Sequence, residues 1–171
     1  GHSDWETDAI RFQTVEDRRD FIHKELSTEN SDKNDWLDDV NGDGFRDWKD
    51  LTVEKNQLIR LEDKDGDGRA DYSVVVSQGY NDEVSDVTGA IAVDDENIFL
   101  DVGPDMWRLK DTNGDGVADE QESIAHGFSI HIGFSGHGMS GAIMGPDGKI
   151  YWGIGDPGFN GVDKAGKKHD Y

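Results

Sequence analysis

Three short acidic segments carry side chains of the type and spacing that bind a calcium ion. Each follows the pattern of an EF-hand loop, with Asp or Asn at positions 1, 3, 5 and 9 and Gly at position 6. Ca2+ takes about six to eight oxygen ligands, and alternating acidic side chains in a tight loop bring such oxygens to one point. The candidate ligands are Asp39, Asn41, Asp43, Asp47 and Asp50 in the first segment, Asp63, Asp65, Asp67 and Asp71 in the second, and Asp111, Asn113, Asp115, Asp119 and Glu122 in the third.

The residue at position 12 distinguishes the three segments. Asp50 and Glu122 complete the pattern in the first and third, whereas the second has Val74. Asp-Gly and Asn-Gly pairs also form hairpin turns, so acidic turns without an ion are the alternative. Strand-like runs flank the second and third segments, which predicts calcium loops on hairpins with a structural role. The first segment leads into Trp48–Leu51, a candidate helix start, and resembles half of a dockerin.

The composition fits a folded, calcium-binding protein and excludes several other classes. The 171 residues include 17 Lys and Arg against 38 Asp and Glu, a net charge of −21 that excludes binding to nucleic acid or to anionic membranes. Five Trp, four Tyr and seven Phe are too many for a disordered acidic chain, and no apolar run is long enough for membrane insertion. Calcium loops fill where calcium is plentiful, so we expect a periplasmic or extracellular protein whose signal peptide is absent from this chain.

The elements that position these segments are predicted to be a helical N-terminal part and a strand-rich remainder. Residues 1–50 form the first part, with a helix over Val15–Glu25 that Thr14 and Asp17 cap. Residues 51–171 contain short apolar runs between Gly, Asp and Asn, the pattern of an all-β region. The predicted strands are Leu58–Leu61, Tyr72–Ser77, Gly89–Val93, Asn97–Val102, Met106–Leu109, Ser123–Ala125, Gly141–Met144 and Lys149–Ile154.

An internal repeat organises this strand-rich part. Arg60 corresponds to Arg108 at an offset of 48, and Ile98 corresponds to Ile150 at an offset of 52. Residues 59–103 and 107–155 are therefore two copies of one unit. A strand-rich repeat of roughly 40–50 residues is typical of a β-propeller blade. We predict a mainly β fold: a partial β-propeller of two clear blades, the N-terminal part of a larger propeller that supplies the remaining blades. A small two-repeat β-sandwich is the alternative.

The second copy contains a histidine-bearing insertion that the first copy lacks. Its four extra residues lie within Ser129–Ser140, where His137 is surrounded by glycines. Insertions in repeat proteins form loops on one face, which is often the binding face. On this evidence alone, His137 is either an ordinary loop histidine or a residue that meets a ligand.

The segment from His137 to Asp156 resembles one family. It contains the histidine and the Gly-Pro-Asp-x-Lys-Ile-Tyr and Ile-Gly-Asp motifs of soluble quinoprotein glucose/sorbosone dehydrogenases. The wider chain, with its Asp-Gly-Asp-Gly loops, is similar to large propeller proteins of planctomycete-type bacteria that are labelled membrane-bound dehydrogenases. The resemblance implies a six-bladed parent propeller that uses pyrroloquinoline quinone (PQQ) and calcium, and a cytochrome c as electron acceptor.

The resemblance also implies roles for two residues. His137 falls on the catalytic base of the family and Asp156 on the acid that orients it, so a sugar or alcohol hydroxyl would lose its proton to the imidazole. Two positions depart from the family, because Gly136 replaces an acidic residue and Gly161 replaces a glutamine of the sugar pocket. The residues that hold the quinone come from later blades in the family, so this chain alone is expected to be inactive.

A propeller that has kept its shape without its chemistry is the alternative function. The chain would then be a calcium-dependent binding or structural module of an exported protein. The two readings differ in geometry. In an enzyme His137 and Asp156 are hydrogen-bonded on an open surface, whereas in a non-catalytic module His137 is buried or unpaired.

Overall fold

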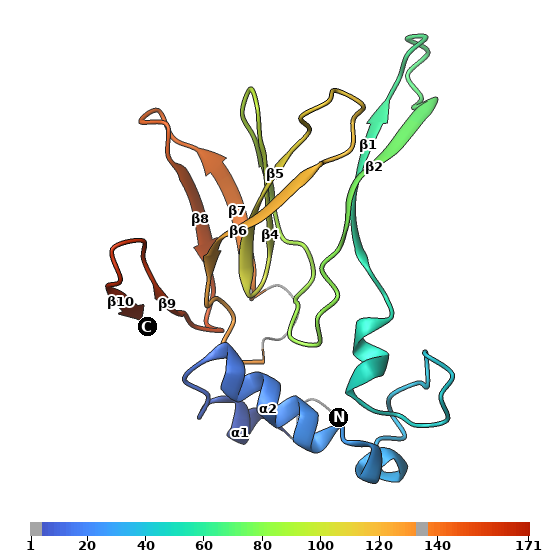
Figure 1. The fold of residues 1–171 in the computed structure, drawn as a ribbon, viewed down its shortest axis with the longest axis vertical. Coiled ribbons are helices and arrows are strands. Elements are labelled where there is room, and N and C mark those ends of the chain that lie inside the picture. The colour runs from blue at the N-terminus through green and yellow to red at the C-terminus, as the bar shows by residue number, and fades with distance from the viewer. Residues whose placement is uncertain (1–4, 133–136) are drawn as a thin grey trace.

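The computed structural model describes residues 5–132 and 137–171 (Figure 1). Strands account for 34% and helices for 16% of the residues, which confirms the prediction of a mainly β protein. The helices gather at the base of the molecule, and the β-sheets rise above them side by side (Figure 1).

From residue 5 on, the N-terminal part contains the α-helices α1 (Glu6–Ala9) and α2 (Val15–Glu25) and the 3-10 helices η2 (Thr28–Lys33) and η3 (Trp48–Thr52). Helix α2 has the predicted bounds. Its first turn is closed by a capping box, in which the Thr14 hydroxyl accepts from the Asp17 amide and the Asp17 carboxylate accepts from the Thr14 amide.

Helix α2 is attached to the strand-rich part by an apolar contact and a buried cation. Val15 and Ile22 pack with Val84 and Ile130, which lie in loops between strands. The Arg18 guanidinium, which is 6% exposed, donates to the Ser129 carbonyl at 2.8 Å and to the Asp86 carboxylate at 3.0 Å. These contacts fix the helix beneath the sheets.

The strands follow the predicted order. All eight predicted runs fall on strands β1 to β8, and the structure adds the short pair β9 and β10. The bounds are β1 (Asn56–Glu62), β2 (Tyr72–Gly79), β3 (Ile91–Val93), β4 (Ile98–Val102), β5 (Asp105–Lys110), β6 (Glu120–His126), β7 (Met139–Met144), β8 (Ile150–Ile154), β9 (Asn160–Val162) and β10 (Lys168–Asp170).

The central sheet is a four-stranded antiparallel meander in the order β3-β4-β5-β6. The described strands also form three two-stranded sheets, β1-β2, β7-β8 and β9-β10. The β4/β5 register pairs Ile98 with Leu109 and Leu100 with Trp107. Since one sequence repeat runs from β5 to β8, the repeat in the sequence is out of phase with the four-stranded sheet.

Two apolar layers hold these sheets together on either side of the central one. Leu100 and Leu109 pack with Leu58 of β1, whereas Phe99 and Met106 pack with Trp152 of β8 and its neighbours. Successive side chains of a strand point to opposite faces, so the adjacent residues Phe99 and Leu100 pack in different apolar layers. The sheets β1-β2, β3-β6 and β7-β8 are therefore stacked face to face (Figure 1).

Candidate functional site

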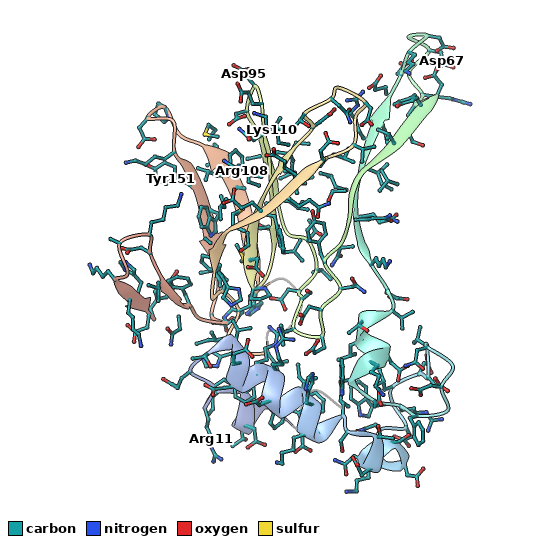
Figure 2. All side chains as sticks on the ribbon, viewed as in Figure 1. Arg11, Asp67, Asp95, Arg108, Lys110 and Tyr151 are labelled. Atoms are coloured by element: carbon teal, nitrogen blue, oxygen red, sulfur yellow. The ribbon has the colours of Figure 1, made fainter. Side chains whose placement is uncertain are left out.

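The second acidic loop forms the tip of the β1-β2 hairpin, where Asp67 is exposed to solvent (Figure 2). The Asp63 carboxylate accepts from the amides of Gly66 at 2.6 Å and Gly68 at 2.8 Å, and Asp65 accepts from the Asp67 amide at 3.1 Å. Carboxylate oxygens of Asp63, Asp65 and Asp67 lie within 4.8 Å of one another. The loop thus brings three acidic side chains to one point.

Two glycines produce this geometry. Gly66 and Gly68 have φ values of +79° and +87°, a left-handed conformation that side chains other than glycine seldom adopt. The turns direct both amides toward Asp63, and the hydrogen bonds from Gly68 and Gly66 lower the pKa of its carboxyl. Asp63 therefore stays ionised even next to Asp65 and Asp67, as a cation ligand must.

The third loop, between β5 and β6, has the same hydrogen bonds. Asp111 accepts from the amides of Gly114 at 2.7 Å and Gly116 at 2.8 Å, and those amides lower its pKa. Asp119, at position 9, accepts from the Thr112 amide at 2.8 Å, as Asp71 accepts from Lys64 at 3.0 Å in the second loop. The common sequence pattern thus gives one backbone conformation twice.

Glu122 does not join the third loop. It lies in β6, where its carboxylate accepts from the Arg108 guanidinium of β5 at 2.5 Å. In a helix–loop–helix the residue at position 12 returns to the ion, but here an extended strand carries it away. That Glu122 is a bidentate calcium ligand therefore stays a prediction, since its carboxylate is bonded to Arg108 in this structure.

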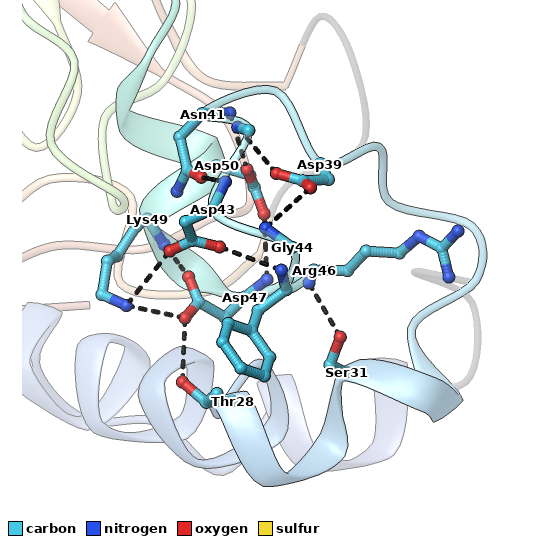
Figure 3. Close-up of polar contacts among 12 residues, drawn as sticks. Thr28, Ser31, Asp39, Asn41, Asp43, Gly44, Arg46, Asp47, Lys49 and Asp50 are labelled. Atoms are coloured by element: carbon cyan, nitrogen blue, oxygen red, sulfur yellow. Dashed lines mark hydrogen bonds and ion pairs between the residues drawn. The ribbon is translucent and has the colours of Figure 1, made fainter.

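The first loop begins like the other two and ends differently (Figure 3). Asp39 accepts from the amides of Gly42 at 2.7 Å and Gly44 at 3.0 Å. Asp50, at position 12, returns to the loop and accepts from the amides of Val40 at 2.9 Å and Asn41 at 3.1 Å. The loop is thus closed at position 12, whereas position 9 closes the other two.

Asp47, at position 9 of the first loop, has different hydrogen-bond partners from Asp71 and Asp119. Its side chain is fully buried, and it accepts from the Lys49 amide at 3.0 Å, the Lys49 ammonium at 2.9 Å and the Thr28 hydroxyl at 3.0 Å. Burial opposes ionisation, but the hydrogen bonds from Lys49 outweigh it and lower the pKa of Asp47. Asp47 therefore caps η3 and joins it to Thr28 of η2.

The donor sets of all three loops suit a hard cation. Every candidate ligand offers oxygen, which matches the preference of Ca2+. Among the described residues, only the second loop brings three carboxylates within 4.8 Å. The first and third loops have Asn41 and Asn113 at position 3, so an amide oxygen replaces the middle carboxylate there.

His137 and Asp156 are brought together by the β7-β8 pair. The register pairs Met139 with Ile154, and the Gly155 amide donates to the His137 carbonyl at 3.1 Å, so the residues before β7 and after β8 are neighbours. His137 Nδ1 lies 2.8 Å from Asp156 Oδ1, with 55% and 76% of the two side chains exposed. A Cβ at position 155 would collide with the His137 carbonyl, so this approach requires glycine.

The contact with Asp156 uses only Nδ1 of the His137 ring. Across residues 5–132 and 137–171, no hydrogen bond reaches Nε2. A carboxylate at Nδ1 favours the tautomer with its proton on Nδ1, so Nε2 can accept a proton from a ligand. The exposed pair can therefore act as a general base.

Gly136 and Gly161, the two residues that differ from the quinoprotein dehydrogenases, lie in different parts of the chain. Gly136 lies outside the described residues. Gly161 is in β9, where a Cβ would lie 2.5 Å from the His126 carbonyl and 2.6 Å from the Phe159 ring. A side chain does not fit at position 161, so Gly161 is a packing residue.

Sequence reasoning did not identify a second histidine–carboxylate pair. His126 Nδ1 lies 2.9 Å from Asp105 Oδ1, and Ser123 donates to the same oxygen at 2.5 Å. The hydrogen bond to Asp105 raises the pKa of His126. The two residues are 21 positions apart and meet only through the β5/β6 register, which a single sequence does not display.

A cavity of about 540 Å³ lies beside β8, next to this pair. Its walls come from β6, β8 and the β9-β10 hairpin, and they are largely apolar. The lining includes Ile124, His126, Phe128, Trp152, Phe159 and Tyr171. His137 and Asp156 are not among the residues that line it.

None of the helices in the described part of the chain is long and apolar enough to cross a membrane.

Comparison with known proteins gives a family without an assigned activity. No curated protein and no solved structure matches the sequence. Residues 49–170 match the family described as a domain of unknown function, DUF7133. Because the match spans more than two thirds of the sequence and all ten strands, the chain belongs to this family.

Proposed function

We propose that this protein is the N-terminal part of a calcium-stabilised, quinoprotein-like dehydrogenase propeller that acts on a sugar or alcohol. The observation that carries the proposal is the hydrogen bond between His137 Nδ1 and Asp156 Oδ1, at 2.8 Å on an exposed surface. This is the arrangement expected of a base and its orienting acid.

The chemistry of the pair is proton abstraction from a hydroxyl group. His137 Nε2 accepts the hydroxyl proton while the carbon that bears the hydroxyl loses hydride to an acceptor. Asp156 holds the neutral ring in the correct tautomer and stabilises the imidazolium that forms. PQQ, when bound, would supply the hydride acceptor, and a cytochrome c would take the electrons from it.

The quinone itself is not held by the pair. PQQ carries carboxylates, whose recognition calls for cationic side chains. Within the described part of the chain, the only side chain hydrogen-bonded to His137 is the Asp156 carboxylate. In this proposal the chain supplies the base beside PQQ, and later blades of the propeller supply further groups that bind it.

Three features of the fold support the propeller. The central sheet is a four-stranded antiparallel meander, which is the form of one blade. The sheets on its two faces consist of strands equivalent to half a blade each, by the offsets of 48 and 52. Three stacked sheets also differ from the two packed sheets of a β-sandwich.

Calcium has a structural role in this proposal. The second and third loops close the β1-β2 and β5-β6 hairpins, and the first closes the segment that leads into η3. An ion at such a site neutralises clustered carboxylates and fixes the turn. We place the protein in the periplasm or outside the cell, where calcium is abundant enough to fill these loops.

The test is a thermal melt of the chain in EDTA, in calcium, and in calcium with PQQ. A ligand that binds only the folded state raises the melting temperature by mass action. We expect calcium to raise it, PQQ to raise it further, and His137→Ala to lose only the second increment. His169→Ala is the matched control, because His169 forms another exposed pair, with Asp163 at 3.0 Å. No increment from PQQ, either in this chain or in the full-length parent that carries the later blades, contradicts the dehydrogenase proposal.

The second candidate function is a calcium-dependent binding module without catalysis. The 540 Å³ cavity favours it, because this volume suits a small ligand and its aromatic lining suits an apolar or sugar surface. A calcium increment without a PQQ increment, in this chain and also in the full-length parent, supports this candidate. Absence of any calcium response contradicts both.

A further inference from the structure

A second cavity, of about 480 Å³, lies between the end of strand β2 and strands β5 and β6 of the central sheet. Its lining also includes residues of the loop 80–85 and Arg19 of helix α2. This volume falls within the range of about 300–1,000 Å³ that is usual for small-molecule sites. The cavity is therefore a candidate binding site whose walls come from four parts of this chain.

This cavity lies away from the edges at which a larger propeller would add strands. Among the described strands, β1 pairs only with β2 and β8 only with β7, so further strands can join at the open edges of β1 and β8. None of the described lining residues belongs to β1 or β8. Strand β6 is the last strand of a complete four-stranded sheet, and β2 is its equivalent at the offset of 48. Strands added at the open edges would therefore leave the cavity open.

The charged side chains of the lining are already paired within the protein. The Arg19 guanidinium lies 2.8 Å from Asp82 and 2.5 Å from Glu83, and His126 Nδ1 lies 2.9 Å from Asp105. An anionic ligand would meet the carboxylates of Asp82 and Asp105, and a cationic ligand would compete with Arg19 and His126 for them. The lining therefore favours a neutral ligand.

Neutral polar groups of the lining have hydrogen-bonding capacity that the fold does not use. Gln78 accepts from Gln57 at 3.2 Å through its carbonyl oxygen, and no described residue engages its NH2 group. Across residues 5–132 and 137–171, no hydrogen bond reaches the side-chain amide of Gln121, the indole N–H of Trp107 or Nε2 of His126. These groups offer both donors and acceptors to the cavity. They suit a ligand that carries hydroxyl groups.

Trp107 gives the cavity an aromatic wall. Its ring packs against Tyr80, with the ring centroids 5.2 Å apart at an interplanar angle of 64°. Tyr80 has a left-handed backbone at φ +56°, which is uncommon for a residue with a bulky side chain, and its hydroxyl is hydrogen-bonded to Ser77 at 2.5 Å. The equivalent of Trp107 in the first repeat is Ile59, so the hairpin does not by itself require an aromatic residue here.

We propose that this cavity binds a sugar ring. A sugar has apolar C–H groups on its faces and hydroxyl groups around its edge, so an aromatic wall and planar polar side chains suit it. Trp107 would pack against the C–H groups, and Gln78, Gln121 and His126 would form hydrogen bonds with the hydroxyls. A free monosaccharide and one residue of a longer glycan share this chemistry.

The sugar site is separate from the proposed catalytic pair. His137 and Asp156 are not among the described residues that line the cavity. A sugar bound here would therefore be held without being oxidised. The proposal goes beyond the dehydrogenase and does not depend on it.

The experiment titrates the wild-type chain in calcium and follows binding by calorimetry and by saturation-transfer NMR. The probes are D-glucose, D-galactose, D-mannose and D-xylose, and the trisaccharides maltotriose, cellotriose, mannotriose and xylotriose. We expect at least one probe to bind with a dissociation constant of about 1 mM or below. Tighter binding of a trisaccharide than of its monosaccharide identifies a glycan as the source of the ring, and equal binding identifies the free sugar.

A double variant, Gln78→Ala with Gln121→Ala, tests the site. Both residues are exposed, so the fold should survive, and the loss of their hydrogen bonds should weaken binding about tenfold or more. Glu120→Ala with Glu122→Ala is the matched control, because both residues lie in β6 beside Gln121 but outside the cavity lining. The control should bind as the wild type does.

Trp107→Ala should abolish binding, and circular dichroism shows whether this half-buried substitution leaves the chain folded. If it does not, the glutamine double variant decides. A wild type that binds no probe at concentrations up to about 10 mM, or binding that the double variant retains, overturns the proposal. Binding that is lost in His137→Ala but kept in the double variant places the sugar at the proposed base, which overturns the second site and supports the dehydrogenase.

Discussion

The hairpins β1-β2 and β5-β6 are the same structure in two different surroundings. Their loops share the acidic pattern, and their strands correspond residue for residue at an offset of 48. Yet Leu109 is completely buried in the central sheet, whereas its equivalent Leu61 is 64% exposed. Local sequence therefore gives both hairpins their form, and the neighbouring strands decide which side chains become core.

Inside the two hairpins the loop backbone is alike and the cross-strand pairs differ. The loop hydrogen bonds of Asp63 are repeated by Asp111 with nearly equal distances. The strand pairs diverge, because Asp105 faces His126 in one hairpin and Gln57 faces Gln78 in the other. Equivalent residues of the two hairpins can therefore be substituted in the same way, and the results show how the surrounding sheets affect each residue.

The largest expected difference comes from one substitution at two equivalent positions. Leu109→Ala removes a buried side chain and should cost about 2–5 kcal/mol in the free energy of unfolding. Leu61→Ala removes an exposed side chain and should cost less than about 0.5 kcal/mol in the monomer. Urea denaturation at low protein concentration measures both values. Equal losses would show that Leu61 is buried in solution.

Removal of calcium should have the next largest effect. Calcium at about one hundred times its dissociation constant adds about 2.7 kcal/mol per site to the free energy of unfolding. Asp65→Asn with Asp67→Asn should reduce this increment, because both carboxylates belong to the cluster of the second loop. Glu122→Gln should preserve it, because Glu122 is bonded to Arg108 in β6. Urea denaturation in calcium and in EDTA measures this increment. If Glu122→Gln abolished the stabilisation by calcium, Glu122 would have to be a calcium ligand.

A smaller effect should appear as a dependence on pH. The bond to Asp105 raises the pKa of His126 above its ordinary value of 6.5. The pair therefore adds stability below about pH 6.5, and this stability is lost as the pH rises through the higher pKa of the folded state. The gain should stay below about 1 kcal/mol, because the His126 side chain is 55% exposed and solvent screens the charge.

His126→Gln tests this pH dependence, because it copies Gln78, whose partner Gln57 donates to it at 3.2 Å without a titrating group. The difference in unfolding free energy between wild type and variant should shrink from pH 5.5 to pH 8.5, a range of roughly one and a half units either side of pH 7. A difference that does not change with pH would show that His126 and Asp105 do not form an ion pair.

The smallest effect is expected at the pair of Arg108 and Glu122. The equivalent of Glu122 in β2 is Val74, so Glu122→Val converts one hairpin toward the other. Both side chains of the ion pair are exposed, at 43% and 56%, so its loss should change the free energy of unfolding by less than about 0.5 kcal/mol. A loss above about 2 kcal/mol in urea denaturation would show that the pair is structural.

Much of the fold could be predicted from short-range patterns. The capping residues Thr14 and Asp17 located helix α2, and alternating apolar runs between turn residues located β1 to β8. The hairpin β9-β10 was missed because its strands are three residues long and Lys168–Asp170 contains no apolar residue. The hydrogen bonds of Glu122 to Arg108 and of Asp47 to Lys49 could not be predicted either, because both depend on the element that follows the loop.

The sequence by itself determined the local structures: the acidic loops, the strands and their repeat, because glycine conformations, turn preferences and side-chain alternation act over a few residues. Only the tertiary structure decided which residues meet across strands, as His137 meets Asp156 and His126 meets Asp105. It also decided that Leu109 is core and Leu61 is surface. The physical reason is that burial and cross-strand contact depend on register and on neighbouring sheets, which residues far apart in the chain provide.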